Sequence, residues 1–178
     1  MKTEGKFRDG LIELMNDVPL SDINVVMLCE YVHSNRQTFY YHYRDISDVI
    51  ESIFLKEKIG IGKKMNDFES INKVFVNYVN VSYRFLAEVV KSYAGDKFSD
   101  FVFSFYYRHL INCATKAQKA DINYSMIVRY ISTIMAKELT FWVSTKRKEK
   151  SADLLKRTDV LWNYLSIRYL NDLKKARI

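Results

Sequence analysis

The sequence predicts an all-α protein, and three features of its 178 residues support that fold class. Pro19 is the single proline and there are five glycines, so the chain has few of the turn residues that β hairpins require. Apolar residues recur at spacings of three and four, which is typical of amphipathic helices. Asn, Asp and Ser residues stand where several of these helices would begin. The length is enough for one or two domains with a sizeable core.

Four helices are predicted in the first 60 residues. The first ends near residue 16, because Pro19 disfavours a helical conformation at Val18 and donates no backbone hydrogen bond. Asn24 is a suitable N-cap for the second, and Ser34 or Asn35 for the third. The fourth begins near Asp45 or Ser47 and ends where two glycines suit a helix C-terminus. The predicted spans are residues 7–16, 25–32, 36–43 and 45–59.

The remainder of the chain predicts four longer helices. Asp96, Asp121 and Ser151 are the expected N-caps of the last three. Their expected spans are residues 70–93, 96–117, 122–147 and 151–175.

Residues 35–43 read Asn-Arg-Gln-Thr-Phe-Tyr-Tyr-His-Tyr and form the segment most informative about function. On a helix, Phe39 and Tyr43 lie one turn apart and face inward, which leaves the other side chains outward. Arg and Gln bind base edges in the major groove, and hydroxyl groups bind phosphate oxygens. The segment is preceded by another predicted short helix, over residues 25–32, and a three-residue break separates the two. This spacing is typical of a helix-turn-helix. The alternative is that the aromatic residues simply pack against a neighbouring domain.

Residues 35–46 resemble the recognition region of TetR/AcrR-family transcriptional regulators, in which Thr-Phe-Tyr-Tyr-His-Phe is common. The sequence of residues 35–46 is most similar to that of a Firmicute-type subgroup that includes activators of dihydroxyacetone-kinase operons. The resemblance implies that Thr38, Tyr40 and His42 contact phosphates, that Arg36, Gln37 and Tyr41 face bases or sugar edges, and that Asn24 caps the second helix near a phosphate. The candidate DNA-binding residues are Asn24, Asn35, Arg36, Gln37, Thr38, Tyr40, Tyr41 and His42.

Three positions depart from the family pattern. His33 stands where the family has Gly in the turn, so the turn needs a backbone conformation that His tolerates, which includes the left-handed region. Ile46 replaces a common phosphate-binding Lys, and Val26 replaces a base-reading Arg found in some members. The affinity for DNA would then depend more on other basic side chains, or be lower. Those side chains are Arg36, Arg44, Lys56 and Lys58.

The net charge of +7 does not by itself support DNA binding by this segment. The basic excess lies in residues 116–178, whereas residues 1–50 carry more acidic than basic side chains.

The resemblance to TetR/AcrR-family regulators divides the chain into a DNA-binding domain over 1–60 and a helical regulatory and dimerisation domain over 61–178. It implies a homodimer on a palindromic double-stranded operator, acting as a repressor. The alternative is a helical protein-interaction module whose N-terminal domain no longer binds DNA.

Two groups of residues are candidates for the regulatory functions of the second domain. Aromatic side chains can line an apolar effector pocket, and the basic excess suits a protein co-regulator. Apolar stripes on the last two helices can close a monomer core or pair with a second copy. The effector-pocket candidates are Tyr78, Tyr83, Phe101, Phe105 and Arg108, and the dimer candidates are Ile127, Ile131, Ile134, Phe141, Leu161 and Leu165.

Enzymatic function is not expected, because no acid–base pair, nucleophile motif or phosphate-binding loop occurs. Cys29 and Cys113 have no metal-type spacing and are expected to be free thiols in a reducing compartment. The three histidines have no zinc-motif spacing, so no metal or other cofactor is expected. The N-terminus lacks a signal-peptide pattern and no segment is apolar enough to span a membrane, which predicts a cytoplasmic protein without membrane contact.

Overall fold

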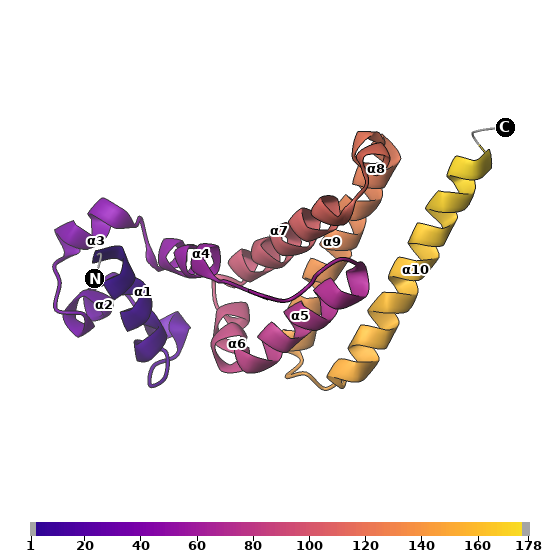
Figure 1. Ribbon diagram of the computed structural model, residues 1–178. Coiled ribbons are helices and arrows are strands. Elements are labelled where there is room, and N and C mark those ends of the chain that lie inside the picture. The colour runs from indigo at the N-terminus through magenta and orange to yellow at the C-terminus, as the bar shows by residue number, and fades with distance from the viewer. Residues whose placement is uncertain (1–2, 176–178) are drawn as a thin grey trace. The chain divides into compact units, whose positions relative to one another are not determined.

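The computed structural model describes residues 3–175, with side chains up to Ser166, and its regular elements within that range are all helical. This confirms the predicted all-α fold class. In chain order, shown in Figure 1, the elements are α1 (Thr3–Leu14), a 3₁₀ turn (Leu20–Asp22), α2 (Val25–Tyr31), α3 (Arg36–His42), α4 (Ile46–Lys56), α5 (Phe68–Val81), α6 (Tyr83–Lys91), α7 (Gly95–Cys113), α8 (Lys116–Ala120), α9 (Ile122–Ser144) and α10 (Ser151–Lys175).

The helices group into two compact units. The first comprises Met1–Lys58 and Ser82–Phe101, and the second comprises Ile59–Val81 and Val102–Ile178. Sequence order therefore does not match spatial grouping, because α6 and the start of α7 belong with the N-terminal helices. The functional division near residue 60 stays a prediction.

The core of the first unit is built by α1, α2, α3 and α4, with α1 packed against both α2 and α4. Phe7 and Phe39 are fully buried, and their rings meet edge to face with centroids 5.2 Å apart. Phe54 of α4 stacks on Phe101 with centroids 4.7 Å apart. Lys97 of α7 donates to the Glu51 carboxylate of α4 at 2.6 Å. These contacts attach α4 to the later part of the unit.

In the second unit α5 and α9 both pack against α10, and a buried polar cluster links α5, α7 and α10. The Asn72 side chain donates to the Thr158 hydroxyl at 2.8 Å and accepts from the Tyr106 hydroxyl at 2.8 Å. Because buried polar groups without partners are costly, these matched hydrogen bonds specify how the three helices pair. Asp159 also accepts from Asn72, at 3.2 Å.

Several predicted boundaries were wrong. The helix predicted over 70–93 is two helices that break at Ser82, and the one predicted over 96–117 ends at Cys113 before the short α8. Thr115 begins α8 with a capping box, in which its hydroxyl accepts from the Gln118 backbone and its backbone donates to the Gln118 side chain. Near the expected end of α4, Gly60 has a φ of +72°, but the helix has already ended at Lys56.

The expected N-caps also had mixed outcomes. The Asp121 side chain accepts from the Asn123 backbone at 2.8 Å and caps α9 as predicted. Asp96 instead lies inside α7, which begins at Gly95. The Ser151 hydroxyl bonds the Asn80 side chain, and backbone donors at the start of α10 reach the Lys150 carbonyl. Ser151 is therefore the first residue of α10 and not its N-cap, and its side chain bonds α5 instead.

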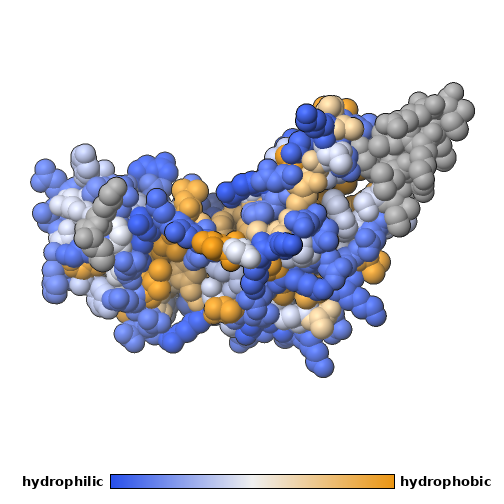
Figure 2. Space-filling view, viewed as in Figure 1, coloured by the Kyte–Doolittle hydropathy of each residue, from blue (hydrophilic) through white to orange (hydrophobic). Residues whose placement is uncertain are grey.

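Most residues on the face shown in Figure 2 are hydrophilic, with smaller hydrophobic patches between them. Among the described helices, none combines the length and apolar character needed to cross a lipid bilayer.

Candidate nucleic-acid interface

The two short helices α2 and α3 each begin with an asparagine that caps the helix. The Asn24 side-chain oxygen accepts from the backbone N–H groups of Val26 and Met27 at 3.0 and 3.1 Å. The Asn35 side-chain oxygen accepts from the backbone N–H of Thr38 at 2.7 Å. Helices of seven residues are too short to be stable alone, so caps and tertiary contacts supply their stability. The predicted starts of both helices and the cap Asn24 are confirmed, Asn35 is the cap of the two candidates for α3, and each helix ends one residue before the predicted end.

The turn between α2 and α3 is a Schellman motif with His33 in the left-handed region. Ser34 donates its backbone N–H to the Cys29 carbonyl at 2.8 Å, and His33 donates to Glu30 at 3.1 Å. His33 has a φ of +48°, where glycine is the residue with least strain. Of the conformations that the sequence left open for His33, the turn therefore takes the left-handed one, at a cost of about 1 kcal/mol.

The α3 helix has one face in the core and another in solvent. Phe39 is fully buried and Tyr43, directly after the helix, is 7% exposed, as predicted. Tyr40 and Tyr41 are 57% and 85% exposed. Arg36 and Gln37 are also exposed, whereas Thr38 and His42 are half-buried. The structure therefore brings a guanidinium, an amide and two phenol groups together on one solvent-facing surface.

Two of the predicted contact groups already have partners within the chain. The Arg44 guanidinium donates to both carboxylate oxygens of Asp48, at 2.7 and 2.6 Å. This pairing holds the pKa of Asp48 below its usual value of 3.8. The His42 ring nitrogen Nδ1 lies 3.8 Å from the Glu4 carboxylate. Arg44 is thus a less independent DNA contact than the sequence suggested.

A polar cluster under the C-terminal end of α3 was missed by the sequence analysis. The Tyr43 hydroxyl lies 3.1 Å from the Glu4 carbonyl, 3.3 Å from Arg8 Nη1 and 3.3 Å from Ser52 Oγ. Arg8 also donates to Ser52 at 3.1 Å. The available signal was Tyr43 itself, which stands where the resembled pattern has Phe and so brings an extra hydroxyl into the core.

The candidate effector residues fall in both units. Tyr83 and Phe101 belong to the first, and Tyr78, Phe105 and Arg108 to the second. The Phe101 ring stacks on Phe54, while the Phe105 ring lies 4.6 Å from Phe75. Arg108 is exposed. Their role in effector binding stays a prediction.

The candidate dimer residues differ in exposure. Ile131 is fully buried by the chain's own helices, so it belongs to the monomer core. Phe141 is 67% exposed. The remaining four are half-buried: Ile127, Ile134, Leu161 and Leu165.

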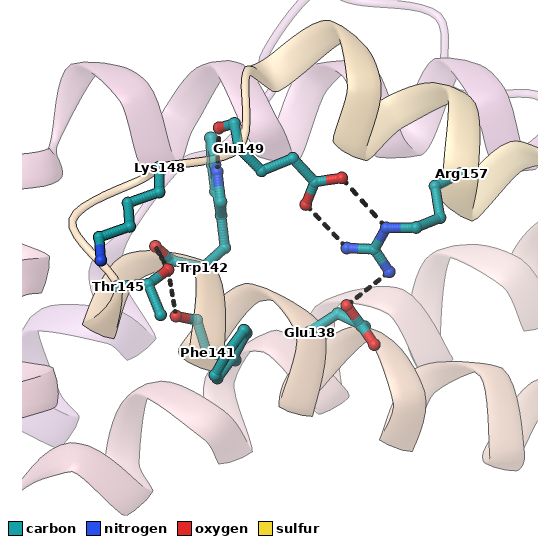
Figure 3. Close-up of a pocket in the computed structure, with 7 residues that line it drawn as sticks. All are labelled: Glu138, Phe141, Trp142, Thr145, Lys148, Glu149 and Arg157. Atoms are coloured by element: carbon teal, nitrogen blue, oxygen red, sulfur yellow. Dashed lines mark hydrogen bonds and ion pairs between the residues drawn. The ribbon is translucent and has the colours of Figure 1, made fainter.

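Phe141 also lines a pocket of about 350 Å³ at the α9–α10 turn, shown in Figure 3. Arg157 closes one wall by bonding Glu149 and Glu138, with its closest contact at 2.7 Å to Glu138. Trp142 Nε1 donates to the Glu149 carbonyl at 2.8 Å. The turn is therefore held by specific bonds. No group of three or more metal-ligating side chains occurs among the described residues.

No protein-family model matches this chain, and no curated protein matches its sequence. Among solved structures, a dihydroxyacetone kinase operon activator superposes with a TM-score of 0.64 at 15% sequence identity. The match covers 93% of this chain and 97% of the activator. At this identity the likeness is one of fold, and it extends over both units. The chain therefore shares its helical architecture with a protein named as an operon activator.

Proposed function

We propose that this protein is a sequence-specific DNA-binding transcription regulator whose α3 enters the major groove. The observation that carries the proposal is the exposed face of α3, where Arg36, Gln37 and Tyr41 point to solvent from a helix anchored by Phe39. Arg and Gln offer bidentate hydrogen bonds to guanine and adenine, and tyrosine hydroxyls bind phosphates. The capped α2 and α3 and the tight turn between them have the form of a helix-turn-helix.

The protein acts as a homodimer in this proposal. Exposed apolar side chains lie along α9 and α10, where they would contact the same helices of a second copy. A two-fold dimer presents two α3 helices to half-sites about 34 Å apart, which matches a palindromic operator. The exposed apolar residues of these helices include Ile122, Met126, Tyr130, Phe141, Val160 and Tyr164.

Control of the regulator is proposed to pass through the second unit, by a small effector or a protein co-regulator. The fold likeness to an operon activator and the resemblance to repressors favour opposite signs of regulation. A reporter gene placed behind the bound promoter distinguishes the two, because deleting the regulator raises expression from a repressed promoter and lowers it from an activated one.

The test is DNA binding by the full chain, measured by fluorescence anisotropy with duplexes from the region upstream of its own gene. We expect one fragment to bind specifically, with an affinity that falls steeply as salt rises because bound Lys and Arg release counterions. A scrambled duplex of the same composition is the control. If no fragment shows salt-sensitive binding, the proposal is wrong and the interaction-module alternative is favoured.

A further inference from the structure

We infer that Tyr43, together with Arg8 and Ser52, is a positioning residue that sets the orientation of α3 on the first unit. The inference rests on the proposed DNA-binding function and adds a set of residues that lie outside the exposed face of α3. The three side chains come from the end of α3, from α1 and from α4, so one cluster joins three helices.

The hydroxyl hydrogens of Tyr43 and Ser52 and the two hydrogens on Arg8 Nη1 can each be assigned an acceptor within the cluster. Tyr43 donates its hydroxyl proton to the Glu4 carbonyl and accepts from Arg8 Nη1. Arg8 Nη1 carries two hydrogens, and the second is donated to Ser52. Ser52 can then donate its own proton to the Tyr43 oxygen, 3.3 Å away. Each hydrogen assigned in this way has one acceptor, so a shift of α3 would break several bonds at once.

Apolar packing alone leaves the orientation of α3 poorly fixed. Of its seven residues, all within the described range, Phe39 is the one that is buried. The Tyr43 ring, directly after the helix, is buried beside Phe39, with the two centroids 5.8 Å apart. Two neighbouring rings in a pocket resist withdrawal more than they resist rotation or tilt of the helix, since the hydrophobic effect is not directional. Hydrogen bonds are directional, and the Tyr43 hydroxyl makes its bonds one turn beyond Phe39.

The cluster is also an expensive way to gain stability. Arg8 has a side chain only 17% exposed, and its nearest carboxylate oxygen, on Glu4, is 3.9 Å away. Burying a guanidinium against two neutral hydroxyl groups offsets much of the gain from the bonds it makes. Apolar residues of similar volume would give comparable stability, so the arrangement is better explained by the geometry it imposes.

The test compares Tyr43→Phe with wild type on two duplexes. One is selected by the wild-type chain from a random-sequence library, and the other is its scrambled version. We expect Tyr43→Phe to weaken binding to the selected duplex by about fivefold to tenfold, because α3 loses the directional bonds of the Tyr43 hydroxyl. Binding to the scrambled duplex and its salt dependence should not change, because phosphate contacts tolerate a small tilt. Ser52→Ala should act similarly, and the double variant should lose no more than the larger single effect.

Ile50→Val is the matched control, because Ile50 is fully buried in α4 and the change lowers stability without touching the cluster. It should leave the ratio of selected to scrambled binding at the wild-type value. The inference is overturned if Tyr43→Phe reduces stability but keeps that ratio, or if it weakens both duplexes equally. A wild-type chain that binds neither duplex overturns the proposed function as well, and is recognised because the wild type itself fails.

Discussion

The helices α3 and α9 both expose a surface to solvent, but the two surfaces have different chemistry. The α3 helix exposes Arg36, Gln37 and Tyr41, whose groups form hydrogen bonds with fixed directions. The α9 helix exposes Ile122 and Phe141, whose burial against any apolar surface is favourable because it removes them from water. These two chemistries suit the two functions proposed above, recognition of a polar partner by the first unit and self-association by the second.

The largest effect is expected from removing the anchor of α3. Phe39→Ala deletes a fully buried ring and should lower the free energy of unfolding by about 3 to 5 kcal/mol. Tyr41→Ala, on the opposite face, should change it by no more than about 0.5 kcal/mol. Urea denaturation followed by circular dichroism measures both. Equal losses would mean that the two faces of α3 are not distinct.

A paired comparison on α9 separates core from interface. Ile131→Ala should destabilise the folded chain by about 2 to 5 kcal/mol, because Ile131 is fully buried. Phe141→Ala should leave helicity intact and weaken self-association by about 1 to 2 kcal/mol, as expected for an aromatic interface residue. Sedimentation velocity over a concentration series gives the dimer dissociation constant. An unchanged constant would place the dimer contact elsewhere.

The next effect concerns the start of α3. Asn35→Ala removes the acceptor for the Thr38 backbone N–H and should cost about 1 kcal/mol. Asn35→Ser keeps a capping oxygen and serves as the control, with a loss of a few tenths of a kcal/mol. Thermal unfolding of the two variants checks the order. If both variants match wild type, capping contributes little to this helix.

Local signals in the sequence were sufficient for the short helices. Asn24, Asn35 and Asp45, all among the cap candidates, each cap the helix that follows. His33 takes the left-handed conformation that the family's glycine at this position had made one option. These features depend on residues within five positions of one another. The helix caps and the turn can therefore be predicted without knowledge of the tertiary structure.

Features that join distant residues were beyond the sequence analysis. Periodicity gave Ile131 and Phe141 the same role, although one is buried and the other exposed, because the neighbours that cover a helix are set by tertiary packing. The Arg8, Tyr43 and Ser52 cluster combines positions up to 44 residues apart. The same limitation hid the grouping of residues 82–101 with the N-terminal helices.

The smallest effect is a pH dependence in the second unit. Burial raises the pKa of Asp159 above its usual value of 3.8, while the hydrogen bond from Asn72 opposes the rise. The folded state therefore holds this proton more tightly than the unfolded state, and stability is lost as pH rises through the folded pKa. Asp159→Asn should be more stabilising at pH 7 than at pH 3.5 in urea denaturation. A larger gain at the lower pH would contradict the burial effect.

The central claim, that the exposed face of α3 reads DNA, is tested most directly by binding of the selected duplex to Arg36→Ala and Tyr41→Ala. We expect each variant to lose about 1 to 3 kcal/mol of binding free energy with unchanged helicity. Tyr93→Ala, which removes another exposed tyrosine of the first unit, should bind as wild type. Wild-type affinity in both α3 variants would contradict the claim.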